Sequence, residues 1–157
     1  MRVYRFRVSI MGLPKLYRII EAPGNCTFDD LHKVIFRAFD REEEHLYSFF
    51  ITGKDTRNIR MIYDSPEITN SHDTEGIMSF GKRAESASKT RIGDVGLNEK
   101  DVLHYWFDYG DDWWHRIRVQ HVDETKTQRK RITVIKSVGE SPPQYPDYDY
   151  DFDEEYE

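Results

Sequence analysis

The strongest constraint on the fold is a period of two in the first ten residues, MRVYRFRVSI. Large apolar side chains fall on one face of this segment, at Tyr4, Phe6, Val8 and Ile10, whereas arginines and Ser9 fall on the other. This is the pattern of a half-buried β-strand. Gly-Leu-Pro at 12–14 interrupts the alternation, which resumes over 15–22, so the two segments predict an antiparallel β-hairpin with one apolar face.

A single amphipathic helix is expected directly after this hairpin, over residues 28–39. Thr27 and Asp30 fit the N-terminal capping pattern, and Asp29 adds a second negative charge in the first turn, where the helix dipole favours it. Apolar residues then recur at helical spacing, at Phe28, Leu31, Ile35, Ala38 and Phe39. The helix should therefore lay an apolar stripe on the sheet.

Further strands are expected where β-branched and aromatic residues concentrate, over 45–52, 58–64, 102–109, 113–122 and 131–138. Residues 90–97 are expected to hold a short helical turn. The strands precede and follow one helix without β-α-β alternation. The sequence therefore predicts an α+β fold, a mostly antiparallel sheet of about six to seven strands with one main amphipathic helix packed on one face.

At 157 residues the chain is expected to form one domain. We expect an α+β domain over 1–140, with a mobile loop near 65–89, and a tail over 141–157 that is first Pro-rich and then acidic and aromatic. The net charge is −6, and residues 145–157 alone hold seven acidic side chains and no Lys or Arg. The rest of the chain is therefore close to neutral.

The lone cysteine, Cys26, excludes an internal disulfide framework and a Cys-rich zinc site. No stretch approaches the roughly 20 apolar residues that span a bilayer, and the N-terminus lacks the apolar core of a signal peptide. The sequence therefore predicts a cytoplasmic protein with no membrane partner.

Residues 105–119, YWFDYGDDWWHRIRV, gather aromatic, acidic and basic side chains in one stretch. Gly110, Asp111 and Asp112 form a turn signal between two strands. A two-residue turn would place six side chains on one face of the hairpin, namely Trp106, Asp108, Trp113, His115, Ile117 and Val119. Trp114 and Arg116 would lie on the opposite face. A loop with an odd number of residues would break this arrangement.

Several segments resemble the plasmid pRi ORF-three-like family, whose members are also known as passenger proteins of insertion elements. FDYGDDWWHRIRV is similar to the family's Tyr-Asp-Phe-Gly-Asp-x-Trp-x-His signature, and LPKLYRIIEAPGNCTFDDLHKVIFRAF to its strand-then-helix segment. HLYSFFI, RIGDVGL and GESPPQYP match further segments in order, whereas the acidic ending replaces the family's usual Pro-Pro-Glu-Asp-x-Gly-Gly terminus. The resemblance implies a compact α+β domain and brings no established activity with it.

An acid–imidazole group is the sharpest candidate for chemistry. Asp108, Asp111 and His115 are candidate catalytic residues, and together with His45 they are candidate ligands of a divalent metal. The alternative is structural: Asp108 pairs with His115 to close the hairpin, and Asp111 makes a turn. We favour the structural alternative, because it explains each residue without a ligand.

Aromatic and basic residues on the expected strands are candidates for binding, namely Trp106, Trp113, Trp114, Arg18 and Arg116. Arginines beside exposed rings can bind single-stranded nucleic acid by stacking and phosphate contact, although a near-neutral body and an acidic tail argue against strong binding. The tail itself could be a disordered end, dock on a basic groove of another protein, or imitate nucleic acid.

The sequence contains no Gly-x-Ser-x-Gly motif, phosphate-binding loop or dinucleotide fingerprint. The leading hypothesis is a non-enzymatic interaction module that binds a protein through the 105–119 hairpin and the aromatic strands. One alternative is a metal-dependent hydrolase or nuclease at the Asp/His group. The other is a protein that binds single-stranded nucleic acid.

Overall fold

The computed structural model describes residues 1–70, 84–108, 112–124 and 131–144. The elements in chain order are β1 (Arg2–Ile10), β2 (Leu13–Pro23), α1 (Phe28–Ala38), β3 (Tyr47–Phe50), α2 (Ile59–Tyr63), β4 (Glu67–Thr69), β5 (Glu85–Ser86), the 3-10 helix η1 (Ile92–Val95), β6 (Val102–Phe107), β7 (Trp113–Glu124) and β8 (Thr133–Val138). The strands form one sheet in the order β5-β4-β3-β6-β7-β1-β2-β8. Neighbouring strands are antiparallel, except that β4 and β5 are parallel.

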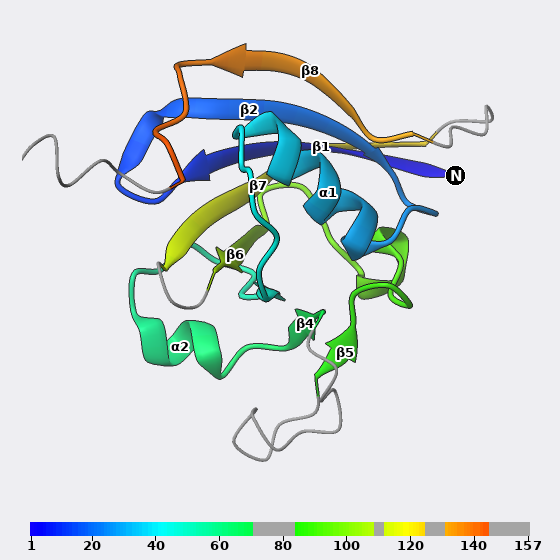
Figure 1. The fold of residues 1–157 in the computed structure, drawn as a ribbon. Helices are drawn as coiled ribbons and strands as arrows, with labels where there is room; N and C mark the ends of the chain where they lie inside the picture. Colours follow the sequence, from blue (N-terminus) through cyan, green and yellow to red (C-terminus); the bar gives the residue numbers. More distant parts are fainter. Residues whose placement is uncertain (71–83, 109–111, 125–130, 145–157) are drawn as a thin grey trace, which may run out of the picture.

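This architecture confirms the α+β fold with one main helix on a mostly antiparallel sheet (Figure 1). The described strands number eight, slightly more than the sequence predicts. The β1–β2 hairpin forms as its alternation requires, and the four apolar side chains of β1 are all buried, namely Tyr4, Phe6, Val8 and Ile10.

Helix α1 begins where its capping sequence predicts. Thr27 Oγ1 accepts a hydrogen bond from the Asp30 amide at 3.1 Å, and Asp30 Oδ2 accepts one from the Thr27 amide at 3.0 Å. Leu31, Ile35 and Phe39 are buried in the hydrophobic core that the helix shares with the sheet. The helix thus packs through its apolar stripe, as expected.

The pleat of the sheet gives it two faces with different chemistry. Tyr105 and Phe107 on β6, with His115 and Ile117 on β7, point toward α1 and are buried there. We call this the covered face. The residues between these on the strands, such as Trp114 and Arg116, point the opposite way. We call that side of the sheet the open face.

Residues 58–64 were expected to form a strand, and this prediction is wrong, because they form helix α2. Asn58 caps the helix by accepting hydrogen bonds from the amides of Arg60 and Met61 at 3.1 and 3.4 Å. Tyr63 then packs against Trp106 on the open face, with ring centroids 5.6 Å apart. Capping and packing therefore outweigh the strand preference of the segment.

The expected loop near 65–89 is bounded by ordered chain. Strands β4 and β5 lie at its two ends, and residues 71–83 lie outside the described residues. Among the described residues, no helix has the length and apolar character to cross a membrane.

The chain after β8 stays attached to the fold up to Gln144, beyond the domain boundary expected at residue 140. Gln144 is buried, and its Oε1 accepts hydrogen bonds from the amides of Glu42 and Glu43 at 2.7 and 3.1 Å. Its Nε2 donates to the Glu43 carbonyl oxygen at 3.0 Å. The acidic part of the tail, 145–157, lies outside the described residues.

Candidate functional site

The register of the β6–β7 hairpin differs from the expected one. Tyr105 pairs with His115 and Phe107 with Trp113, so the connecting loop has an odd length and spans 108–112. Trp106 consequently lies on the open face, whereas His115 lies on the covered face, and the prediction that they share a face is wrong. Asp108 leaves the strand with φ 61°, a left-handed conformation that Asp tolerates.

His115 is buried on the covered face, where it acts as a neutral hydrogen-bonding group. Its Nδ1 lies 3.0 Å from the Trp113 carbonyl oxygen, which can only accept, so Nδ1 carries the proton and donates. The unprotonated Nε2 accepts from Arg41 Nη2 at 3.3 Å. Burial, and then the Arg41 charge, lower the pKa of His115 to about 3, so the ring is neutral near neutral pH.

Arg41 is an unusual cation because it is only 7% exposed. Its guanidinium carbon lies 4.1 Å from the centroid of the Trp113 ring, a cation–π contact that partly replaces lost hydration. Its Nε and Nη1 have no hydrogen-bond partner among the residues that the structure describes. Burial lowers the pKa of Arg41 to about 10.

Asp108 pairs with His45 and not with His115. His45 Nε2 lies 3.4 Å from Asp108 Oδ2 and 3.9 Å from Glu43 Oε2. Asp111, the remaining member of the candidate metal site, lies outside the described residues. Across the described ranges, no group of three or more His, Cys, Asp or Glu side chains is arranged to hold a metal ion.

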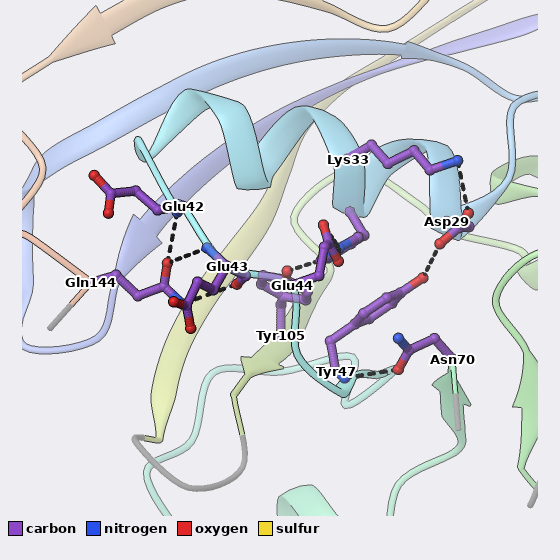
Figure 2. A network of polar contacts seen from close by, with 10 residues as sticks. Asp29, Lys33, Glu42, Glu43, Glu44, Tyr47, Asn70, Tyr105 and Gln144 are labelled. Atoms are coloured by element: carbon purple, nitrogen blue, oxygen red, sulfur yellow. Dashed lines mark hydrogen bonds and ion pairs between the residues drawn. The ribbon is translucent and has the colours of Figure 1, made fainter. Parts of the chain in front are cut away.

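Beside this cluster lies a polar network that the sequence did not indicate (Figure 2). His32 Nε2 donates to Glu44 Oε2 at 2.9 Å, and its Nδ1 accepts from the Tyr105 hydroxyl at 2.6 Å. The imidazole stacks on the ring of Tyr47 at 3.8 Å, and the Tyr47 hydroxyl donates to Asp29 Oδ1 at 2.6 Å. The network joins α1 to β3 and β6, because its members come from three distant segments of the chain.

Burial sets the protonation states of this network. It lowers the pKa of His32 although Glu44 opposes the shift, and it raises the pKa of Tyr47 and of Tyr105 far above their usual value. Burial alone would raise the pKa of Asp29, but hydrogen bonds from Tyr47 and Lys33 turn the shift downward. The network is therefore anchored by a charged carboxylate and holds a neutral imidazole.

Two of the candidate binding residues have structural roles on the covered side. Arg18 is buried and donates hydrogen bonds to the carbonyl oxygens of Ala38, Tyr17 and Val138 at 2.9, 3.0 and 3.0 Å. Trp113 stacks on Arg41 and donates through Nε1 to the Gln144 carbonyl oxygen at 3.2 Å. Arg18 also donates to Ser141 Oγ at 3.1 Å, so both side chains tie the covered face to the segment after β8.

The other candidate binding residues lie on the open face. Trp106 and Trp114 stack with centroids 5.0 Å apart and planes 2° from parallel, and Tyr63 of α2 packs against both rings. Two apolar side chains of α2, Ile59 and Met61, are exposed nearby along the helix. We call these five residues the aromatic patch.

Arg116 continues the open face into a basic cleft of about 240 Å³ between the β1–β2 turn and the segment before α2. Four arginines line this cleft, Arg7, Arg57, Arg116 and Arg118, and we call it the arginine cleft. Asp55 is the acidic residue of the lining, and its Oδ2 lies 2.9 Å from Arg116 Nε. The cleft therefore has an excess of positive charge and suits an anionic ligand.

Comparison with known proteins supports the fold and the family. A crystal structure of a protein of unknown function, MM3350 from Methanosarcina mazei Go1, superposes with a TM-score of 0.70 at 24% sequence identity. The match covers 98% of this chain and 78% of that one. A search of curated proteins found no match. The family model described as plasmid pRiA4b ORF-3-like protein matches residues 2–145, so the chain belongs to this family.

Proposed function

We propose that the protein is a non-enzymatic interaction module whose aromatic patch binds a partner protein. The observation that carries this proposal is the exposure of the patch. Ile59 and Met61 are each 40% exposed and Tyr63 is 37% exposed, on one short helix that lies beside two stacked tryptophans. Tyr, Trp, Met and Arg are the residues enriched in the cores of protein interfaces.

The charges around the patch indicate the chemistry of the partner. Arg57 and Arg60 are exposed and flank the apolar residues of α2. A partner segment with one or two large apolar side chains and acidic neighbours would match both features. Met61 adds a flexible side chain that can adapt to such a ligand.

A non-enzymatic role is supported by the state of the main catalytic candidate. His115 is 1% exposed, and a pKa of about 3 leaves its imidazole neutral and without contact to solvent at neutral pH. A general base needs both access to the substrate and a pKa near the working pH. His115 has neither property.

Single-stranded nucleic acid fits the patch less well than a protein does. Base stacking requires a free ring face, whereas Trp106 and Trp114 already stack on each other with nearly parallel planes. Tyr63 packs against both of them as well. One face of each tryptophan is therefore already occupied, which leaves less ring surface for base stacking.

The proposal can be tested with a photo-crosslinking amino acid at position 61 in cells, with the same residue at Ile135 as the matched control. Ile135 is 47% exposed but lies on β8, away from the patch. Crosslinked protein is identified by mass spectrometry, and the purified partner is then titrated. We expect Ile59→Asp with Met61→Asp to weaken binding by at least about tenfold, while Ile135→Asp leaves it unchanged.

Two results would reject the proposal. One is that position 61 gives no protein adducts beyond those of position 135. The other is that the partner binds the patch variant and the wild type equally well. Retention of an oligothymidylate that is sensitive to salt and lost in the patch variant would assign the surface to nucleic acid instead.

One observation still supports the metal-dependent alternative, namely the contact between His45 and Asp108. A third ligand would have to come from residues outside the described ranges, such as Asp111. Calorimetric titration with Zn²⁺ and with Mn²⁺ decides this point, since micromolar binding that is lost in both His45→Ala and Asp111→Ala would favour a metal site.

A further inference from the structure

We propose that the protein's own acidic segment, residues 145–157, binds in the arginine cleft and competes there with other anionic ligands. This inference concerns the arginine cleft, which adjoins the aromatic patch and includes Arg57, and it goes beyond the proposed function because it names a ligand for the cleft itself. It assigns an occupant to the cleft by charge, by spacing and by the position from which the segment starts.

The charge of the cleft is the first argument. Four arginines line it against one acidic residue, Asp55. Arg7 is held in place by a hydrogen bond from Nη2 to the Pro14 carbonyl oxygen at 3.2 Å and by stacking of its guanidinium on the Tyr17 ring, 3.8 Å from the centroid. No described residue forms an ion pair with Arg57 or Arg118. The segment 145–157 has the opposite composition, with seven acidic residues and no basic one.

The spacing of the charges is the second argument. Arg116 and Arg118 lie two residues apart on β7 and share the open face, and Arg7 of β1 pairs with Arg118. In the segment, Asp147, Asp149, Asp151 and Asp153 also repeat every two residues, with aromatic residues between them. An extended chain places such carboxylates on one side about 7 Å apart, which matches the repeat along a strand.

The aromatic residues of the segment would then face away from the arginines. Tyr148, Tyr150 and Phe152 alternate with the aspartates. The rim of the cleft formed by Met11 and Pro14 offers apolar surface to part of these rings. An alternating acidic and aromatic segment therefore fits the cleft better than a purely acidic one.

The starting point of the segment is the third argument. The Gln144 carbonyl oxygen accepts a hydrogen bond from Trp113 Nε1. Trp114, which follows Trp113 on β7, accepts a hydrogen bond at its carbonyl oxygen from the Met11 amide at 2.9 Å. Met11 itself lines the cleft. In Figure 1 the chain after β8 returns toward the β1–β2 turn, at the same end of the sheet. Thirteen residues can extend about 43 Å, enough to reach the cleft around the end of the strands.

A ligand that is part of the same chain has a large advantage over a free one. A short flexible connection gives an effective concentration on the order of millimolar. An external anion would therefore bind to the cleft only after displacing the segment, so the segment would set a threshold for that binding.

The test uses the full chain and a fluorescent synthetic peptide of sequence 145–157. Changing Asp147, Asp149, Asp151 and Asp153 to Asn neutralises most of the segment without altering the folded body. We expect the peptide to bind this variant at least about tenfold more tightly than it binds the wild type, measured by fluorescence anisotropy. Raising the salt from about 50 to about 300 mM should weaken the complex.

Adding Arg116→Gln and Arg118→Gln to the neutralised chain should remove the peptide binding, whereas Arg37→Gln, an exposed arginine on α1, should not. Circular dichroism checks that each variant is folded. The proposal is overturned if the wild type and the neutralised chain bind the peptide equally, if neither binds it at low salt, or if the cleft variant binds as well as the Arg37→Gln control.

Discussion

Arginine side chains in this protein fall into two groups according to their burial. Arg18 and Arg41 are buried on the covered face, where they contact carbonyl oxygens, a histidine and aromatic rings. Arg57 and Arg118 are exposed and line the arginine cleft. The sequence predicted binding roles for Arg18 and Arg116 alike, because both lie on expected strands with aromatic residues nearby in the sequence. Their different roles come from the strand register and from the helix above the sheet.

Arg18→Lys should lower the free energy of unfolding by about 2 kcal/mol. Lysine keeps the charge but has no planar fork, so it cannot serve the carbonyl oxygens of Ala38, Tyr17 and Val138 together. Urea unfolding measures the effect. The exposed Arg118→Lys is the control and should stay within about 0.5 kcal/mol of the wild type. Equal losses in the two variants would contradict a structural role for Arg18.

The pair of Arg41 and His115 allows a second prediction at this scale. Burial is the larger cause of the low pKa of His115 and the Arg41 charge the next. Arg41→Met should therefore raise that pKa from about 3, while leaving it below the usual value of about 6.5. Titration of the His115 ring by NMR measures the shift. Arg37→Met, on the outer side of α1, should leave the titration unchanged, and a similar shift there would refute the Arg41 contribution.

At the scale of elements, periodic segments were predictable from the sequence and aperiodic ones were not. β1, β2 and α1 carry long repeats and a complete capping box, and all three formed as expected. Residues 58–64 were misjudged because a short apolar run fits a strand or a helix equally well. The hairpin register failed for a related reason: the loop 108–112 has an odd number of residues in place of the expected two, and an odd loop puts Trp106 and His115 on opposite faces. The His32 network depends on three distant segments, and no local pattern reveals it.

Asn58 marks the start of helix α2 by capping it, whereas the propensities of residues 59–63 did not indicate a helix. Asn58→Ala should remove both side-chain hydrogen bonds at the start of α2 and destabilise the helix by about 1 kcal/mol. Hydrogen exchange of the α2 amides should become faster by about fivefold, while exchange in α1 stays the same. Asn58→Asp, which keeps the capping oxygen, is the matched control. Unchanged exchange in the Ala variant would mean that packing alone holds α2.

The segment after β8 behaves as a structural element although it has no regular secondary structure. Gln144→Ala should cost about 2 kcal/mol of unfolding free energy, because the amides of Glu42 and Glu43 would lose their acceptor. Gln144→Glu keeps an acceptor but loses the donor to the Glu43 carbonyl oxygen and buries a carboxylate there, so it should cost at least as much. Thermal or urea unfolding ranks the three proteins. A wild-type midpoint for the Ala variant would show that the segment is held by other contacts.

At the scale of the whole molecule, the covered and open faces of the sheet carry different kinds of residues. The covered face holds the core, the buried Arg41 and His115, and the network of His32. The open face displays the aromatic patch and the arginine cleft. The candidate residues of the 105–119 hairpin are thus split: the catalytic candidate His115 lies inside the fold, whereas the binding candidates Trp106 and Trp114 lie on the open face. This separation agrees with the proposal that the open face is the binding surface.

The buried histidines predict how the stability of the fold responds to acid. Burial lowers the pKa of His32, His104 and His115, the last to about 3. An unfolded histidine has a pKa of about 6.5, so the unfolded chain binds more protons than the folded one at intermediate pH. The contribution of these neutral histidines to stability is therefore full above about pH 6.5 and falls as the pH drops below that value. For His115 the fall continues down to about pH 3, by up to about 1.4 kcal/mol per pH unit.

His115→Gln removes one of these groups, so its loss of stability with falling pH should be less steep than that of the wild type. The difference should approach 1.4 kcal/mol per pH unit between about pH 6 and pH 4. Urea unfolding across this range gives both slopes, and only slopes are compared because Gln also alters packing at neutral pH. Phe39→Leu is the control, since Phe39 packs against the His115 ring at 5.3 Å but does not titrate. If His115→Gln kept the wild-type slope, His115 would not change its protonation on unfolding, so its imidazole would have to be protonated inside the fold. A protonated Nε2 could not accept the hydrogen bond from Arg41, and that assignment would be wrong.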